Sequence, residues 1–217
     1  KNLPGFEEGY FFVQDSACSA AIEALMPRRE DFIVDVCSCP GGKAFFAAIS
    51  MNNKGKIYCF DLHKSKLSLI ENEAKKLGID ILDISCRDST CAREDLIEKA
   101  DKVICDVPCS GFGVIAKKPE IRYKSISDFT ELDTIQKNIL EESAKYVKVG
   151  GTLLYSTCTL RKAENEERVL KFLENNKNFE LTPFKVGNIS AENGFITLFP
   201  CEKGTDGFFI AKLKRIL

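Results

Sequence analysis

Features that often reveal a metal site or a disulfide framework are scarce in this sequence. Its 217 residues include one histidine, His63, and none of its ten cysteines forms a CxxC pair. Zinc sites are built mainly from closely spaced cysteine and histidine ligands, so we expect no metal site. The chain is long enough to be stabilised by a hydrophobic core, so its scattered cysteines indicate reduced thiols and not a disulfide framework.

An excess of charge and a long apolar run are also lacking. The net charge is −1 at pH 7, which excludes the overall positive field typical of many nucleic-acid-binding domains. No apolar run has the length needed to cross a membrane, and we expect no cationic secretory leader. We therefore expect a cytoplasmic protein without membrane partners, and the length suits one large α/β domain.

Two common nucleotide-binding motifs are missing from the stretch that organises the chain, Phe32 to Lys43 (FIVDVCSCPGGK). It is not GxGxxG, and it is not a phosphate loop, because Cys37 replaces the first glycine and Ala44 replaces the final Ser or Thr. What is present is a β-branched run, a turn with two glycines and the start of a helix. At the carboxyl end of a strand, such a turn exposes helix amides to a ligand, so we interpret it as a cofactor cradle.

Two aspartates follow at the ends of the next two predicted strands. Asp61 closes the strand over 56–60, at about the 20-residue distance where an acidic side chain meets the ribose hydroxyls of adenosine. Asp88 follows the strand over 79–86, where its carboxylate can accept a hydrogen bond from an adenine amino group. Two alternatives remain open, in which Asp61 is a solvated strand end and Asp88 only caps its own loop.

Strand and helix patterns alternate along most of the chain. Apolar spacing and breaker residues predict helices over 16–25, 43–50, 65–77, 131–147 and 163–173 and strands over 32–36, 56–60, 79–86, 102–106 and 152–157. A terminal antiparallel pair is predicted over 195–199 and 207–213. We therefore expect a Rossmann-like α/β fold with a mostly parallel seven-stranded sheet and a terminal hairpin. We expect one domain over 1–217, with a lead-in and helix over 1–30 and the core over 31–217.

Two cysteines lie just past predicted strand ends, Cys109 in DVPCSG and Cys158 in YSTCT. The first, fourth and fifth strands of such a sheet end at the same edge. We therefore expect both cysteines to meet Lys43 and Asp106 in one crevice. Either cysteine alone would be interpreted as an inert buried thiol.

The motifs DVCSCPGGK, DVPCSG and STCT, the last followed by Glu164 and Asn165, resemble in order those of the RNA cytosine-5 methyltransferases that use S-adenosylmethionine. GYFFVQD, KPEIRYK and GTDGFF are also similar to that family, most of all to its bacterial 16S ribosomal RNA branch. The resemblance runs almost end to end. It implies a methyltransferase fold, methylation of C5 of a cytosine in RNA, with 16S rRNA expected, and a monomer. It also implies a separate RNA-binding domain before Lys1.

The resemblance implies roles for individual residues. Cys158 would attack C6 of the cytosine, Cys109 would assist release, and Asp106 would hydrogen-bond the cytosine edge. We expect Lys43 or the sulfonium of the cofactor to lower the pKa of the attacking thiol. The resemblance places the cofactor against Cys37, Ser38, Cys39, Pro40, Gly41, Gly42, Lys43, Asp61, Asp88 and Asp106. The loop departs from the family form CAAPGGKT at Ser38, Cys39 and Ala44.

A basic segment with one aromatic residue follows DVPCSG. Its side chains are expected at the rim of the site, where cations hold phosphates and an aromatic ring stacks on an unpaired base. These residues are Lys117, Lys118, Arg122, Tyr123 and Lys124. A solvated charged loop is the alternative for each of them.

Two other functions are compatible with parts of the pattern. One is a catalytically idle RNA-binding or ribosome-assembly module with the same fold. The other is a nicotinamide-dependent dehydrogenase, suggested by the sheet and Asp61 alone. The paired cysteines argue against both.

Overall fold

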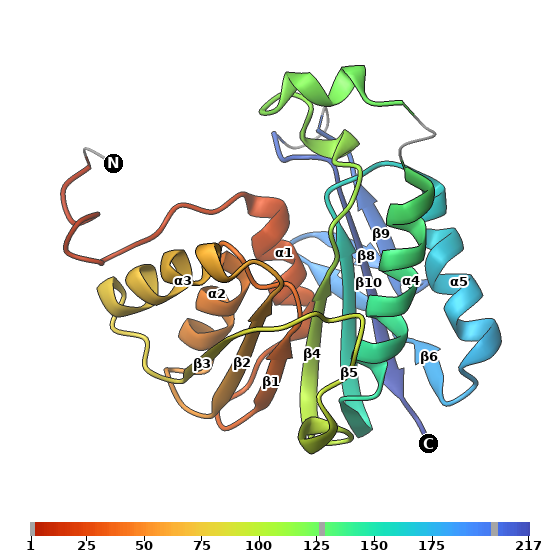
Figure 1. Cartoon of the computed structure of the whole chain (residues 1–217), viewed down its shortest axis with the longest axis horizontal. Coiled ribbons are helices and arrows are strands. Elements are labelled where there is room, and N and C mark those ends of the chain that lie inside the picture. The colour runs from red at the N-terminus through yellow and green to blue at the C-terminus, as the bar shows by residue number, and fades with distance from the viewer. Residues whose placement is uncertain (1–2, 126–128, 201–203) are drawn as a thin grey trace.

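The computed structural model describes residues 3–125, 129–200 and 204–217, so Lys1 and Cys201 lie outside the described residues. Its centre is an eight-stranded sheet (Figure 1). The strands are β1 (Phe32–Asp35), β2 (Lys56–Asp61), β3 (Leu82–Cys86), β4 (Ala100–Asp106), β5 (Val147–Thr157), β6 (Phe179–Leu181), β9 (Phe195–Leu198) and β10 (Phe208–Arg215). A separate two-stranded sheet contains β7 (Phe184–Val186) and β8 (Ile189–Ala191).

The strand order of the large sheet is β3-β2-β1-β4-β5-β10-β6, and β9 also pairs with β10. The first five strands of this order are parallel, whereas β10 runs antiparallel to β5, β6 and β9. The predicted mostly parallel sheet with a terminal antiparallel hairpin is confirmed. Seven strands lie in the continuous order, as predicted. The sheet has an eighth strand, β9, because β6 and β9 both pair with the same edge of β10.

Helices cover both faces of the sheet (Figure 1). One face carries α1 (Ser16–Leu25), α2 (Gly42–Ser50) and α3 (Lys64–Lys76), and the other carries α4 (Thr130–Ala144) and α5 (Glu166–Asn175). Alternate residues of β1 enter different cores, because Ile33 packs with the first group of helices and Val34 with the second. Burial on both faces explains the continuous apolar pattern of this strand.

The structure corrects three predicted boundaries. The helix predicted over 131–147 ends at Ala144, and Val147 already begins β5. The register between β4 and β5 shifts after Val147, and Gly150 takes a φ of 82° in the resulting irregularity. Gly150 and Gly151, the breaker residues after the predicted helix, therefore lie within β5. The third strand begins at Leu82, and not at residue 79. The short strands β6, β7 and β8 were not predicted, because three residues carry too little periodic pattern.

Candidate active site

The carboxyl ends of β1, β4 and β5 meet at one edge of the sheet, and the predicted crevice residues lie there. Lys43, in the first turn of α2, places its Nζ 2.7 Å from Oδ2 of Asp106, the last residue of β4. Ser156 of β5 donates its hydroxyl to Oδ1 of Asp106 at 2.6 Å. The carboxylate is therefore held from both sides, by one cation and one hydroxyl.

The two cysteines that follow β4 and β5 face each other. Sγ of Cys109 lies 3.2 Å from Sγ of Cys158, and both side chains are partly buried. The hydrogen bond from Cys109 lowers the pKa of Cys158 against the opposing effect of burial. The same hydrogen bond, together with burial, raises the pKa of Cys109 well above its usual value. With Cys109 as the donor, the pair carries its proton on Cys109 and its negative charge on Cys158.

Backbone contacts bring a third segment to this pair. The Gly113 amide donates to the Cys158 carbonyl at 2.9 Å, and the Gly207 amide donates to the Gly113 carbonyl at 2.8 Å. A Cβ on Gly113 would lie 2.0 Å from the Gly207 carbonyl oxygen, so the approach requires glycine. These backbone bonds thereby join the segment after β4, Cys158 and the start of β10.

A cavity of about 210 Å³ opens beside the Lys43–Asp106 pair. Six of the seven residues of the predicted cradle line it, namely Cys37, Ser38, Cys39, Pro40, Gly42 and Lys43. Gly41 caps α2 instead, with a φ of 106°, and a Cβ there would lie 2.3 Å from the ring of Phe45. Residues of the lead-in and of α1 complete the wall: Val13, Gln14, Asp15 and Cys18. These four were not predicted, because they lie far from the cradle in sequence.

Asp35 is a further cavity residue that sequence reasoning missed. It ends β1, it is 1% exposed, and its Oδ2 has no hydrogen-bond partner among the described residues. Burial raises the pKa of its carboxyl to about 7, although Lys43 opposes the shift. S-adenosylmethionine carries an ammonium and a sulfonium group, so a cavity with an unpaired buried carboxylate and Asp106 fits its methionine part.

Asp61 and Asp88 do not line this cavity. Asp61 accepts a hydrogen bond from the His63 amide at 2.9 Å. Asp88 accepts from the amide and hydroxyl of Thr90 at 2.9 and 2.7 Å, and these bonds lower its pKa. Both side chains therefore make local contacts at the strand ends: Asp88 caps its own loop, as its open alternative stated, and Asp61 binds the amide two residues later. Their contact with adenosine stays a prediction.

The basic segment after β4 contains two short 3-10 helices, η2 (Phe112–Val114) and η3 (Pro119–Tyr123). Lys117 is already paired, since its Nζ lies 2.7 Å from Asp15 and 2.6 Å from Asp206. The other four residues predicted to contact RNA are exposed, and Tyr123 is 90% exposed. Their contact with RNA stays a prediction.

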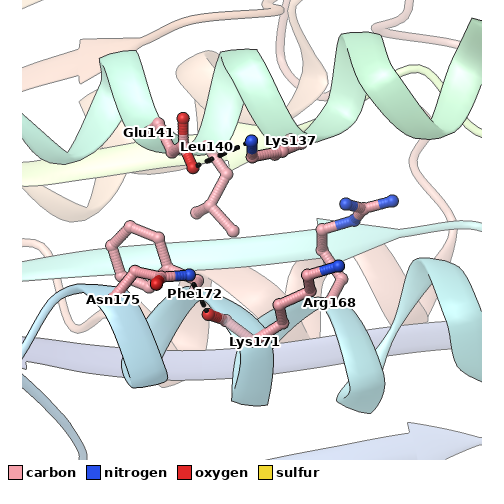
Figure 2. Close-up of a pocket in the computed structure, with 7 residues that line it drawn as sticks. All are labelled: Lys137, Leu140, Glu141, Arg168, Lys171, Phe172 and Asn175. Atoms are coloured by element: carbon pink, nitrogen blue, oxygen red, sulfur yellow. Dashed lines mark hydrogen bonds and ion pairs between the residues drawn. The ribbon is translucent and has the colours of Figure 1, made fainter.

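A small cleft between α4 and α5 is unrelated to this site (Figure 2). The side chain of Leu140 and the aliphatic part of Lys171 lie along it, beside an ion pair of 3.8 Å between Lys137 and Glu141. Its volume is about 10 Å³, enough for about one water molecule. It cannot take a nucleotide-sized ligand.

Metal-binding and membrane-spanning features are absent from the part of the chain that the structure describes. Within residues 3–125, 129–200 and 204–217, no three His, Cys, Asp or Glu side chains are grouped so that they could hold a metal ion. None of the described helices combines the length and apolarity that a membrane crossing needs.

Comparison with known proteins places this site in a family. Residues 22–214 match the family model described as 16S rRNA methyltransferase RsmB/F. A Bacillus subtilis protein named "Probable ribosomal RNA small subunit methyltransferase B" is 38% identical over 219 residues, which cover 97% of this chain and 49% of the relative. A Pyrococcus horikoshii protein named tRNA (cytosine(72)-C(5))-methyltransferase is 33% identical, over 99% of this chain and 54% of the relative.

A comparison with solved structures leads to the same family. The structure described as NSun6 from Pyrococcus horikoshii with SFG, a S-adenosylmethionine analogue, superposes with a TM-score of 0.87 at 32% identity, over 100% of this chain and 56% of that one. The chain spans about half the length of the curated relatives it matches. The family match covers nearly the whole sequence, including the cradle and both cysteine loops, and the chain belongs to the 16S rRNA methyltransferase RsmB/F family.

Proposed function

We propose that this chain is the catalytic domain of an enzyme that methylates C5 of a cytosine in RNA with S-adenosylmethionine as the methyl donor. The observation that carries the proposal is the 3.2 Å contact between Cys109 and Cys158 at the edge of the sheet where the cavity lined by the predicted cradle opens. Relatives of known name that act on cytosine C5 or on ribosomal RNA support the choice of RNA as substrate.

The chemistry needs a nucleophile because cytosine C5 is itself unreactive. When bound, S-adenosylmethionine supplies an electrophilic methyl group. The Cys158 thiolate adds to C6 and forms a covalent sulfur–carbon bond, which makes C5 nucleophilic. After methylation, the C5 proton leaves to a base and the bond between Cys158 and C6 breaks, so the aromatic ring and the thiolate are both restored. Cys109, beside Cys158, assists this release.

Asp106 is proposed to orient the cytosine and to stabilise its protonated ring. Its two oxygens already accept from Lys43 and Ser156, which hold the carboxylate in one orientation. Each carboxylate oxygen has a second lone-pair site, so the group can still accept from the base. Lys43 is held protonated, because the Asp106 carboxylate raises its pKa despite burial.

Ribosomal RNA of the small subunit is the proposed substrate. The description of the family and the Bacillus subtilis relative support it. Transfer RNA is the second candidate, because the Pyrococcus horikoshii relative named for tRNA aligns with 99% of this chain. We also propose that a separate RNA-binding domain precedes Lys1, that 1–217 forms one domain, and that the protein is a cytoplasmic monomer.

The idle-module alternative predicts no chemistry at the cysteines, so a covalent adduct tests the proposal. Full-length Cys109→Ala and Cys158→Ala proteins are incubated with cofactor and either unmodified 16S rRNA or tRNA, and run on a denaturing gel. We expect a protein–RNA band that accumulates in Cys109→Ala and is missing in Cys158→Ala. Cys91→Ala, an exposed thiol, serves as the control and should behave as the unmodified protein.

Each other outcome has a distinct meaning. A band only in Cys158→Ala would exchange the two roles. No band and no methyl transfer with either RNA, while cofactor binds, would contradict the proposed function and favour the idle module. A band with tRNA alone would replace the substrate but keep the reaction.

A further inference from the structure

Glu164 is a fully buried carboxylate beside the cysteine pair, and the proposed chemistry does not use it. It ends the 3-10 helix η5 (Lys162–Glu164) and is 0% exposed. A buried carboxylate is costly unless several donors satisfy it. Its contacts therefore indicate what it holds in place.

Four donors converge on this carboxylate. The amide of Ser110 donates to Oε2 at 2.9 Å, and the hydroxyl of Ser110 donates to Oε1 at 2.5 Å. Gln136 of α4 donates to Oε2 at 2.7 Å, and Arg161 pairs with Oε1 at 3.0 Å. Two of the four bonds thus reach the residue that directly follows Cys109.

The same network reaches the loop of the second cysteine. The hydroxyls of Ser110 and Thr159 are 2.7 Å apart, and Thr159 directly follows Cys158. Asn165, the neighbour of Glu164, accepts from the Thr157 hydroxyl at 2.6 Å and donates to the Thr159 carbonyl at 3.0 Å. Cys158 is therefore held on both sides, and Ser110 links its loop to the loop of Cys109.

We propose that Glu164 is a positioning residue that holds Ser110, and through it Thr159, so that the Cys109 thiol stays within hydrogen-bond distance of the Cys158 sulfur. Because each held residue directly follows a cysteine, a shift of either backbone moves a sulfur atom. The inference rests on the proposed function only in treating Cys158 as the attacking thiol.

Other groups also affect the pKa of Cys158, so the direction of the expected pKa shift has to be worked out. Asp106 of β4 raises its pKa, whereas Lys43 of α2 and the Cys109 hydrogen bond lower it. Removal of the Glu164 charge by itself would make nearby thiols more acidic, since a negative charge disfavours a thiolate. Loss of positioning would instead raise the pKa of Cys158, because the hydrogen bond from Cys109 to the Cys158 thiolate would weaken. The two roles therefore predict shifts of opposite direction.

The test uses the full-length Glu164→Gln protein without RNA or cofactor. The rate of Cys158 alkylation by iodoacetamide is measured from pH 5.5 to 9.5, with the modified peptide identified by mass spectrometry. We expect the midpoint to rise by about one pH unit and the rate near pH 7 to fall about tenfold. Glu167→Gln, an exposed residue three positions later, is the matched control and should leave the profile unchanged.

A second variant keeps the inference testable if Glu164→Gln does not fold. Ser110→Ala retains the buried carboxylate but removes the hydroxyl bridge to Thr159. We expect the midpoint to rise here too and the rate near pH 7 to fall about threefold. A folded variant whose midpoint is unchanged or lower would overturn the positioning role. Since the profile is read without RNA or cofactor, it does not depend on methyl transfer, so failure of this inference is distinguishable from failure of the proposed function.

Discussion

The cofactor cavity and the cysteine pair share one edge of the sheet but are built in opposite ways. In the cavity, the buried Asp35 keeps an oxygen without a partner among the described residues, and the loop of small residues leaves open space. Under the cysteines, both oxygens of Glu164 accept from donors of separate segments. Unsatisfied buried groups carry a cost that a ligand can remove, whereas a carboxylate that accepts from several donors restricts the motion of the segments that supply them. The difference indicates that the cavity is built to bind a ligand, whereas the contacts of Glu164 hold the two cysteines in position.

The largest effect that would test this comparison comes from Lys43→Met. The variant leaves Asp106 without its cation. The side chain of Asp106 is 26% exposed and that of Lys43 is 12% exposed, so the pair lies largely out of water. We expect the free energy of unfolding to fall by about 3 kcal/mol, as for other broken buried ion pairs. Urea denaturation monitored by circular dichroism measures it.

Two controls sharpen that result. Lys56→Met breaks the exposed pair with Asp83 and should cost about 0.5 kcal/mol or less. The double variant Lys43→Met with Asp106→Asn removes both charges and should recover most of the loss. If the single variant costs no more than Lys56→Met, the Lys43–Asp106 pair is not a structural part of the cavity.

A second effect is expected in the pH dependence of stability. The carboxyl of Asp35 has a folded pKa of about 7, above its value in the unfolded chain, because burial disfavours its charged form. Between about pH 4 and pH 7 the folded state then binds more protons than the unfolded state, so stability decreases as pH rises. Asp35→Asn removes this decrease, which three pH units limit to about 4 kcal/mol, and unfolding at a series of pH values measures it.

The comparison predicts that the ligand acts on the same carboxyl. A cationic ligand in the cavity favours the ionised form, so cofactor binding should release protons near pH 6.5. Calorimetry in buffers of different ionisation enthalpy detects this release, and Asp35→Asn should abolish it. An equal release in Asp35→Asn would show that the unpaired oxygen does not face the ligand.

The smallest effect concerns the rim, where Lys117 and Lys118 are neighbours with different partners. Lys117 is paired with Asp15 and Asp206, so its ammonium is less available to phosphate than that of exposed Lys118. Lys117→Met should lower stability by less than about 1 kcal/mol and weaken RNA binding less than Lys118→Met does. Filter binding at low salt compares the two. A larger loss in Lys117→Met would mean that RNA displaces both aspartates.

Much of the site followed from local pattern. The cradle, Cys109 and Cys158 were predicted because each follows an apolar strand, and parallel strands end at a common edge. The resemblance then supplied roles for Lys43 and Asp106, which the structure places in direct contact. The end of α4 was predicted wrongly, because a glycine pair that ends a helix also suits an irregular strand.

The sequence by itself determined the alternation of strands and helices, the order of the motifs and the presence of two cysteines at strand ends. These depend on residue periodicity and on short motifs, which are local. Only the tertiary structure decided that, within the described part of the chain, an oxygen of Asp35 has no partner, that Lys117 is paired, and that Glu164 binds Ser110 across 54 residues of sequence. Such pairings depend on which buried groups the packing of distant segments brings within hydrogen-bond distance, and no local pattern encodes that distance.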